Sequence, residues 1–304
     1  KNHHYIISDP FSLLLMSAFI FSLVYAVQKD RFLFWIFPSL FLALLTLVKA
    51  VFLYFAFLLL VILLLFTVFQ KNKIFFLKIF FLTFLVYGLA VGPWMYRNYQ
   101  ISDYPAITEI RGGIALSKRS ILNNMNIHQY FAALTFWTRG AGDSLAKNFF
   151  SEKNWKPFEL YNPEGFYNLG LQTYYKRLNQ LVGQGMSQTE ASRIVERRLL
   201  EEIVNNLPKH LLVTFPVFYR GLWVDEFILI SFPAFIWAAL LAWKNRRYDI
   251  FVCLLPSMFC LLFYSLFSPN FPRYQLLSLP AFSLSLGLFL EMLRGRIFRN
   301  MLSK

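Results

Sequence analysis

Long, uninterrupted apolar runs alternate along the chain with short polar connections that are mostly basic. The runs are 17–20 residues long, which matches the ~20 residues that an α-helix needs to cross a ~30 Å hydrocarbon core. They lack the strict alternation of apolar and polar residues expected of membrane β-strands. We therefore predict an all-α polytopic membrane protein with about seven transmembrane helices. The predicted spans cover residues 11–27, 32–48, 51–69, 74–93, 226–243, 250–268 and 275–292.

The run over residues 32–69 is too long for one span. As a single helix it would measure roughly 57 Å, nearly twice the hydrocarbon thickness. Lys49 is its only charged residue, and a charge at the centre of a span costs about 2.5–3.5 kcal/mol. We therefore predict two spans that turn at Lys49, close to the membrane surface.

The fourth run ends in "GPWMYRNYQ" over residues 92–100. Gly92, Pro93 and Trp94 are predicted to stop the helix, with Arg97 lying just beyond it. A polar stretch follows, so the sequence suggests three parts. Residues 1–94 form a first four-helix membrane part, 95–222 a mostly helical outer segment of mixed character, and 223–304 the last three membrane helices with a tail.

Basic residues in the short connections predict the orientation, because cytoplasmic loops are enriched in Lys and Arg. Lys49 and Arg273 are the only basic residues in the short connections on the opposite side. The segment 95–222 then faces the periplasm or extracellular space, and the C-terminus faces the cytoplasm. The basic side carries Lys29, Arg31, Lys71, Lys73, Lys78, Lys244, Arg246, Arg247, Arg294, Arg296, Arg299 and Lys304.

Composition agrees with a membrane location. The chain is 57% hydrophobic and 15% charged, against about 45–50% and about 25% in soluble domains. The net charge of +14 is explained by orienting loop charge, so no nucleic-acid partner is predicted. Cys253 and Cys260 lie in one apolar run and are interpreted as packing residues. Neither a cofactor nor a metal is predicted, since no ligand pattern occurs.

The outer segment has recognisable local signals. Ser187 and Glu190 are spaced as a capping box at the start of a helix that Pro208 is expected to stop. The short aromatic stretch that follows, residues 210–223, could lie in the membrane interface. Residues 140–170 are interpreted as an ordered loop with little regular structure, and "RGG" at 111–113 as a turn.

Three cations lie at the outward ends of predicted spans: Lys49, Arg97 and Arg273, the last followed by Tyr274. Each could simply reach to the interface or cap a helix. Together they would suit an anionic phosphate, because Arg binds phosphate in a bidentate way and Lys acts as a point charge. Asp9, like Asp225 and Glu226, is interpreted as a helix N-terminal residue favoured by the helix dipole.

Five stretches resemble the C-terminal part of the GT-C membrane glycosyltransferases. The likeness is to the family 39-type branch of protein mannosyltransferases and aminoarabinose transferases. It covers nearly the whole chain, and the order of the stretches matters more than any one of them. They are "SDPFSLLLMSAFIFS", "LALLTLVKAVFLY", "GPWMYRNYQISDYPAITEIRGGIAL", "EASRIVERRLLEEIVNNLPKHLL" and "FSPNFPRYQLLSLPAF".

The resemblance implies transfer of a sugar from a polyprenyl-phosphate donor to a glycan, glycolipid or protein acceptor at the outer face of the membrane. Lys49 matches a family position expected to bind the donor phosphate, whereas Arg97 and Arg273 are inferred from their place and charge. The family's acidic catalytic residue precedes the region matched here. We therefore expect this chain to be a fragment that is inactive alone, and assign it no catalytic residue.

Two other classes of protein remain open. A transporter or lipid-flipping protein would also explain outward cations, although such proteins usually carry ionisable groups near mid-membrane. A structural membrane subunit with an exposed domain is the third reading. The resemblance favours the transferase.

Overall fold

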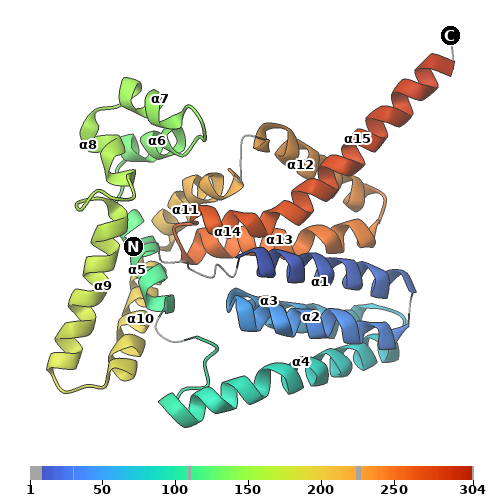
Figure 1. The fold of residues 1–304 in the computed structure, drawn as a ribbon, viewed down its shortest axis with the longest axis horizontal. Helices are drawn as coiled ribbons and strands as arrows, with labels where there is room; N and C mark the ends of the chain where they lie inside the picture. Colours follow the sequence, from blue (N-terminus) through green and yellow to red (C-terminus); the bar gives the residue numbers. More distant parts are fainter. Residues whose placement is uncertain (1–8, 30, 109–110, 224–226, 303–304) are drawn as a thin grey trace. The chain divides into compact units, whose positions relative to one another are not determined.

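The computed structural model describes residues 9–29, 31–108, 111–223 and 227–302, and every regular element within them is helical (Figure 1). Five helical segments there are long and apolar enough to cross a membrane. The all-α class is therefore confirmed. The other two predicted spans coincide with shorter apolar helices, Phe32–Val48 and Ile228–Lys244. The five long segments are α1 (Asp9–Lys29), α3 (Val51–Phe69), α4 (Lys73–Ser102), α13 (Tyr248–Phe267) and the stretch Pro272–Arg294.

The described chain divides into two compact units. Unit 1 holds the residues up to Ile107, together with Leu229–Cys260 and the residues from Leu276 onward. Unit 2 holds Thr108–Ile228 and Leu261–Gln275. Each unit is described separately below. Asp225 and Glu226, predicted to open the fifth span, lie outside the described residues.

In unit 1, α1 packs against α2 (Ile36–Val48), which follows a short 3₁₀ turn, η1 (Phe32–Trp35), and α4 packs against both α2 and α3. The predicted fold-back is confirmed: Lys49 leaves helical geometry with an extended backbone (φ −137°, ψ 103°) between α2 and α3. Hydrogen bonds fix the register of α2 against α4. Ser39 Oγ donates to Thr83 Oγ1 (3.1 Å) and Tyr87 Oη to Thr46 Oγ1 (3.0 Å).

The predicted stop at Gly92–Trp94 is wrong. Helix α4 continues through Pro93 to Ser102, 30 residues in all. Pro lacks an N–H and breaks only one backbone hydrogen bond, which a long helix tolerates when the flanking turns remain paired. The helix ends instead at Asp103, whose backbone is left-handed (φ 53°) and whose N–H donates to the Tyr99 carbonyl.

The rest of unit 1 is formed by α12 (Ile228–Lys244), the first part of α13, η3 (Leu276–Ser278) and α15 (Leu279–Leu302). Aromatic edge contacts join α12 to α15, with Phe235 against Phe282 at 5.5 Å. Phe259 of α13 meets Phe55 of α3 at 5.2 Å. The described part of this core is therefore apolar and rich in phenylalanine.

Unit 2 is more helical than predicted. "RGG" at 111–113 opens a helix rather than forming a turn, and most of 140–170 is helical. Gly113 allows this helix to pack closely against Tyr174, because a Cβ at this position would lie 2.6 Å from the tyrosine ring. The elements are α5 (Arg111–Leu122), α6 (Ile127–Phe136), α7 (Gly142–Phe149), α8 (Glu152–Trp155), η2 (Lys156–Phe158), α9 (Phe166–Gly183), α10 (Gln188–Asn205), α11 (Leu207–Leu222) and α14 (Pro272–Gln275).

Two apolar clusters hold unit 2 together. One joins α5, α9 and α10 around the fully buried Tyr174 and Leu199, and the other joins α6 and α11 around Trp137 and Val217. The predicted cap is confirmed, since the Ser187 side chain accepts from the Glu190 N–H (3.2 Å). Pro208 does not stop α10, which has already ended at Asn205; it lies in the first turn of α11, where proline is tolerated.

Candidate functional site

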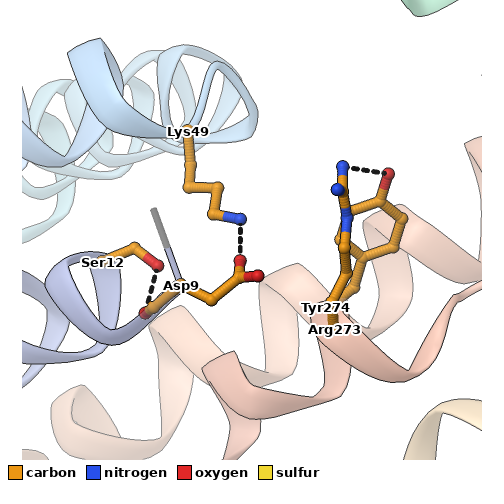
Figure 2. Close-up of polar contacts among 5 residues, drawn as sticks. All are labelled: Asp9, Ser12, Lys49, Arg273 and Tyr274. Carbon is orange, nitrogen blue, oxygen red and sulfur yellow. Dashed lines mark hydrogen bonds and ion pairs between the residues drawn. The ribbon is translucent and has the colours of Figure 1, made fainter. Parts of the chain in front are cut away.

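Lys49 forms an ion pair with Asp9, which lies at the start of α1 (Figure 2). Both side chains are nearly buried, with 10% of Lys49 and 8% of Asp9 exposed. The Ser12 hydroxyl donates to the Asp9 carbonyl at 2.8 Å and closes the first turn of the helix. The sequence interpretation had treated Asp9 only as an N-terminal residue, and it missed this partner. Lys49 is therefore a neutralised cation in this structure.

Arg97 is exposed and lies on the surface of α4. Its guanidinium stacks over the Trp94 ring at 5.0 Å and donates to Asn98 Oδ1 at 3.2 Å. The same two neighbours fasten the chain that follows α4. Trp94 Nε1 donates to the Ile107 carbonyl (3.3 Å), and Asn98 Nδ2 donates to the Ala106 carbonyl (2.6 Å). These contacts support an anchoring role for Arg97 at the end of α4.

The helix directions place Lys49 and Arg97 at the same end of unit 1, because α2 and α4 run parallel. They are not level, however. Tyr87 contacts Thr46, so Arg97 lies ten residues beyond that contact and Lys49 only three. At ~1.5 Å per residue, Arg97 is displaced outward by roughly 10 Å. Within unit 1 the two cations therefore do not form one compact cluster.

Arg273 and Tyr274 belong to α14 in unit 2. The Arg273 guanidinium lies 5.1 Å from the centroid of the Tyr274 ring, and Figure 2 shows the two side chains side by side. Tyr264 also stacks on Tyr274, in parallel at 4.1 Å. Tyr274 thus contacts both a cation and a second ring, and Arg273 is exposed at the surface of unit 2.

A buried polar network in unit 2 was missed by the sequence interpretation. Arg119 of α5 has no exposed surface. Its guanidinium donates to the Ser265 carbonyl (2.9 Å), Asn123 Oδ1 (2.8 Å), the His210 carbonyl (2.9 Å) and Thr214 Oγ1 (2.8 Å). All four acceptors are uncharged, and burial lowers the pKa of Arg119 to about 9. This residue ties α5, α11 and α13 together from inside.

His210 completes that network. Because Asn123 Oδ1 accepts from Arg119, its amide nitrogen faces His210 Nδ1 at 3.1 Å and donates to it. Burial and, to a smaller extent, the nearby Arg119 charge lower the pKa of His210 to about 4. The imidazole is therefore neutral at pH 7.

Two more cations neighbour this network in sequence: Lys118, which is buried, and Arg220, which is half-buried. The sequence did hold a signal for the burial of Lys118 and Arg119. Between Arg111 and Leu122, the helix contains Gly112, Gly113, Ala115, Ser117 and Ser120. Such small residues permit other helices to approach closely on several sides, so a basic pair within them becomes buried.

Other potential sites are sparse in the described part of the chain. No group of three or more His, Cys, Asp or Glu side chains there could hold a metal ion. Cys253 and Cys260 are both buried and free, in agreement with their predicted packing role. An open pocket of about 510 Å³ is lined by Phe136, Asp143, Lys156, Glu159, Leu160, Tyr161, Asn162 and Pro163.

Comparison of this chain with protein-family models, curated proteins and solved structures found no match.

Proposed function

We propose that the chain is part of a membrane glycosyltransferase that moves a sugar from a polyprenyl-phosphate donor to an acceptor at the outer face of the membrane. The resemblance of its ordered stretches to the GT-C enzymes is the origin of this proposal. The span count of seven, the outward orientation of 95–222 and a bacterial inner-membrane location belong to the same proposal.

One observation carries the proposal further than composition does. Lys49 lies in the connection between two apolar helices, nearly buried, with an acidic partner. A nearly buried pair of this kind is costly to desolvate, which makes it a candidate for a functional role. The pair also lies at the end of unit 1 from which the chain continues into unit 2.

The proposed chemistry is a single displacement at the anomeric carbon. The acceptor oxygen forms a bond to that carbon, the bond from the carbon to the donor phosphate oxygen breaks, and a carboxylate base takes the acceptor proton. Lys49 would stabilise the negative charge that grows on the departing phosphate. For this, the ammonium must exchange Asp9 for a phosphate oxygen. Asp9 then acts as the partner that holds Lys49 in place before the donor binds.

The test uses the full-length protein that contains this chain, with a radiolabelled polyprenyl-phosphate sugar as donor. Lys49→Met is expected to reduce turnover at least a hundredfold, since a lost charge contact in a transition state commonly has that effect. Lys78→Met is the matched control, an exposed lysine on the same helix bundle. Normal turnover in Lys49→Met would remove the site proposal.

Arg97→Ala and Arg273→Ala are measured in the same assay. A donor-phosphate role for either residue predicts a raised KM for the donor. Unchanged donor KM with lower thermal stability would leave Arg97 as an anchor of α4. If no polyprenyl-phosphate sugar is turned over by the wild-type protein, transfer of a solute or lipid across the membrane becomes the better account.

A further inference from the structure

Lys118 is a buried lysine whose charge meets aromatic rings. Only 7% of the residue is exposed. Its ammonium lies 3.8 Å from the centroid of the Tyr167 ring and 5.8 Å from that of Phe271. Lys118 comes from α5, Tyr167 from α9, and Phe271 from the loop before α14, all within unit 2.

Arg220 reaches the same ring from another helix, α11. Its guanidinium carbon lies 5.5 Å from the centroid of Phe271 and 4.9 Å from that of Trp137. The ammonium of Lys118 and the guanidinium of Arg220 both lie near the Phe271 ring, so they are at most about 11 Å apart. Arg220 is half-buried, and this burial lowers its pKa to about 10.

Neither cation has an acidic partner among the residues that the structure describes. The ion pairs found there join Asp9, Glu152, Glu202 and Asp249 to other basic residues. Arg220 donates from Nη1 to the Pro269 carbonyl at 3.1 Å. Contacts with rings recover only a part of what a buried cation loses in hydration.

Two buried donors beside these cations also lack an acceptor in the described structure. One is the indole N–H of Trp137, whose ring stacks on Arg220, and the other is the hydroxyl of Ser268, next to Pro269. Buried polar groups are almost always hydrogen-bonded. Among the residues that the structure describes, donors and positive charge at this place outnumber acceptors, an environment that suits a ligand with negative charge.

The backbone around the cluster is closely fitted. Gly170 lets α9 approach α5 at Lys118, since a Cβ at Gly170 would lie 2.5 Å from the Lys118 Cα. Gly221, next to Arg220, lets the Asn270 side chain approach α11, since a Cβ at Gly221 would lie 2.0 Å from the Asn270 amide nitrogen. Gln275 Nε2 donates to the Arg220 carbonyl at 2.8 Å. These contacts hold both cations in defined positions before any ligand binds.

We propose that Lys118 and Arg220, with Tyr167, Trp137 and Phe271 around them, form a binding site for a phosphate group. The site is separate in sequence from Lys49 and does not rest on the glycosyltransferase proposal. A phosphate can accept from a bidentate guanidinium and an ammonium at once, and it has more free oxygens than a carboxylate for the remaining donors. The phosphate belongs to a soluble anion or to a lipid headgroup.

The first experiment uses the full chain purified in a neutral detergent, with inorganic phosphate as the probe. Tryptophan fluorescence, to which Trp137 contributes, and thermal unfolding report binding. Phosphate should change the fluorescence and raise the melting temperature of the wild type. Lys118→Met, which keeps most of the apolar stem, and Arg220→Met should each weaken binding at least tenfold, whereas Lys118→Arg should retain it. Lys176→Met is the control, since Lys176 is exposed on α9.

The second experiment separates the two sources of phosphate. The same proteins are placed in nanodiscs of phosphatidylcholine with or without phosphatidylglycerol. Stabilisation by phosphatidylglycerol that Lys118→Met abolishes, without an effect of inorganic phosphate, identifies a lipid headgroup. Binding of inorganic phosphate in detergent identifies a soluble anion. The proposal is overturned if neither probe stabilises the wild type, or if both Met variants respond as the wild type does.

Discussion

The guanidinium of Arg119 donates to the backbone carbonyl of His210 at 2.9 Å, across 91 residues of sequence. The same guanidinium binds Asn123, which in turn donates to the His210 ring. One buried arginine thus fixes both the backbone and the side chain of a residue on another helix. Because its acceptors are neutral, the network depends on geometry rather than on ion pairing.

Replacing Arg119 by Met is expected to destabilise unit 2 by at least about 3 kcal/mol, because several buried acceptors would lose their donor at once. The thermal midpoint of the purified protein measures this loss. Arg198→Met, an exposed arginine on α10, serves as the control. Equal midpoints for the two variants would show that the buried network contributes little.

Unit 2 should lose stability in mild acid through His210. Its pKa is about 4 in the folded protein against 6.5 ordinarily, so below pH 6.5 the unfolded chain binds a proton that the folded chain refuses. The stability that the neutral His210 contributes to the folded protein is fully present above pH 6.5 and is lost as the pH falls toward 4. The full loss in the free energy of unfolding is on the order of 3 kcal/mol.

Thermal midpoints at pH 7 and pH 5 test the His210 effect. The drop should be smaller in His210→Gln, whereas His128→Gln, at an exposed position, should fall as much as the wild type. An equal drop in His210→Gln would assign the acid sensitivity to other groups.

Gly170→Ala should destabilise the protein by about 1–3 kcal/mol, the usual range for overpacking. The new methyl group would meet the backbone of Lys118, which cannot move aside as a flexible side chain can. Gly183→Ala is the matched control on the same helix, because nothing lies within 4 Å of its added Cβ. That control should be neutral or slightly stabilising, by up to about 1 kcal/mol.

Breaking the Asp9–Lys49 pair from one side should cost about 3–5 kcal/mol, since it leaves a nearly buried charge without a partner. Lys49→Met and Asp9→Asn are each measured alone and together. The double variant should regain most of the lost stability. If it also regains turnover, Lys49 serves structure only; restored stability without turnover supports its proposed contact with phosphate.

The long apolar helices were the most predictable part of the fold. Apolar length and a single charge at Lys49 were sufficient to place the α2–α3 connection, because burying that charge in mid-span is too costly. The end of α4 was misplaced, since Pro93 was read as a stop although its helix remains paired on both sides. Trp94 and Asn98 donate hydrogen bonds to residues 106–107, and these contacts support the helix beyond Pro93. No local sequence pattern reveals them.

The polar sites were less predictable for a physical reason. Lys49 was identified as a candidate, but Asp9 as its partner depends on the packing of α1 against α2. Lys118 and Arg119 look like ordinary surface residues in sequence. Their burial follows from the close approach of α9 and α11, and only the surrounding glycines hinted at it.

The length of α4 also sets where the chain leaves this helix within unit 1. At ~1.5 Å per residue its 30 residues measure about 45 Å, some 15 Å more than a typical hydrocarbon core. Its last turns therefore act as a rigid spacer, and the return of residues 106–107 onto Trp94 and Asn98 fixes the direction of exit. One residue inserted into these turns would rotate that exit by about 100° around the helix axis. The number of residues in α4, and not its composition alone, therefore determines the direction in which the chain leaves the helix.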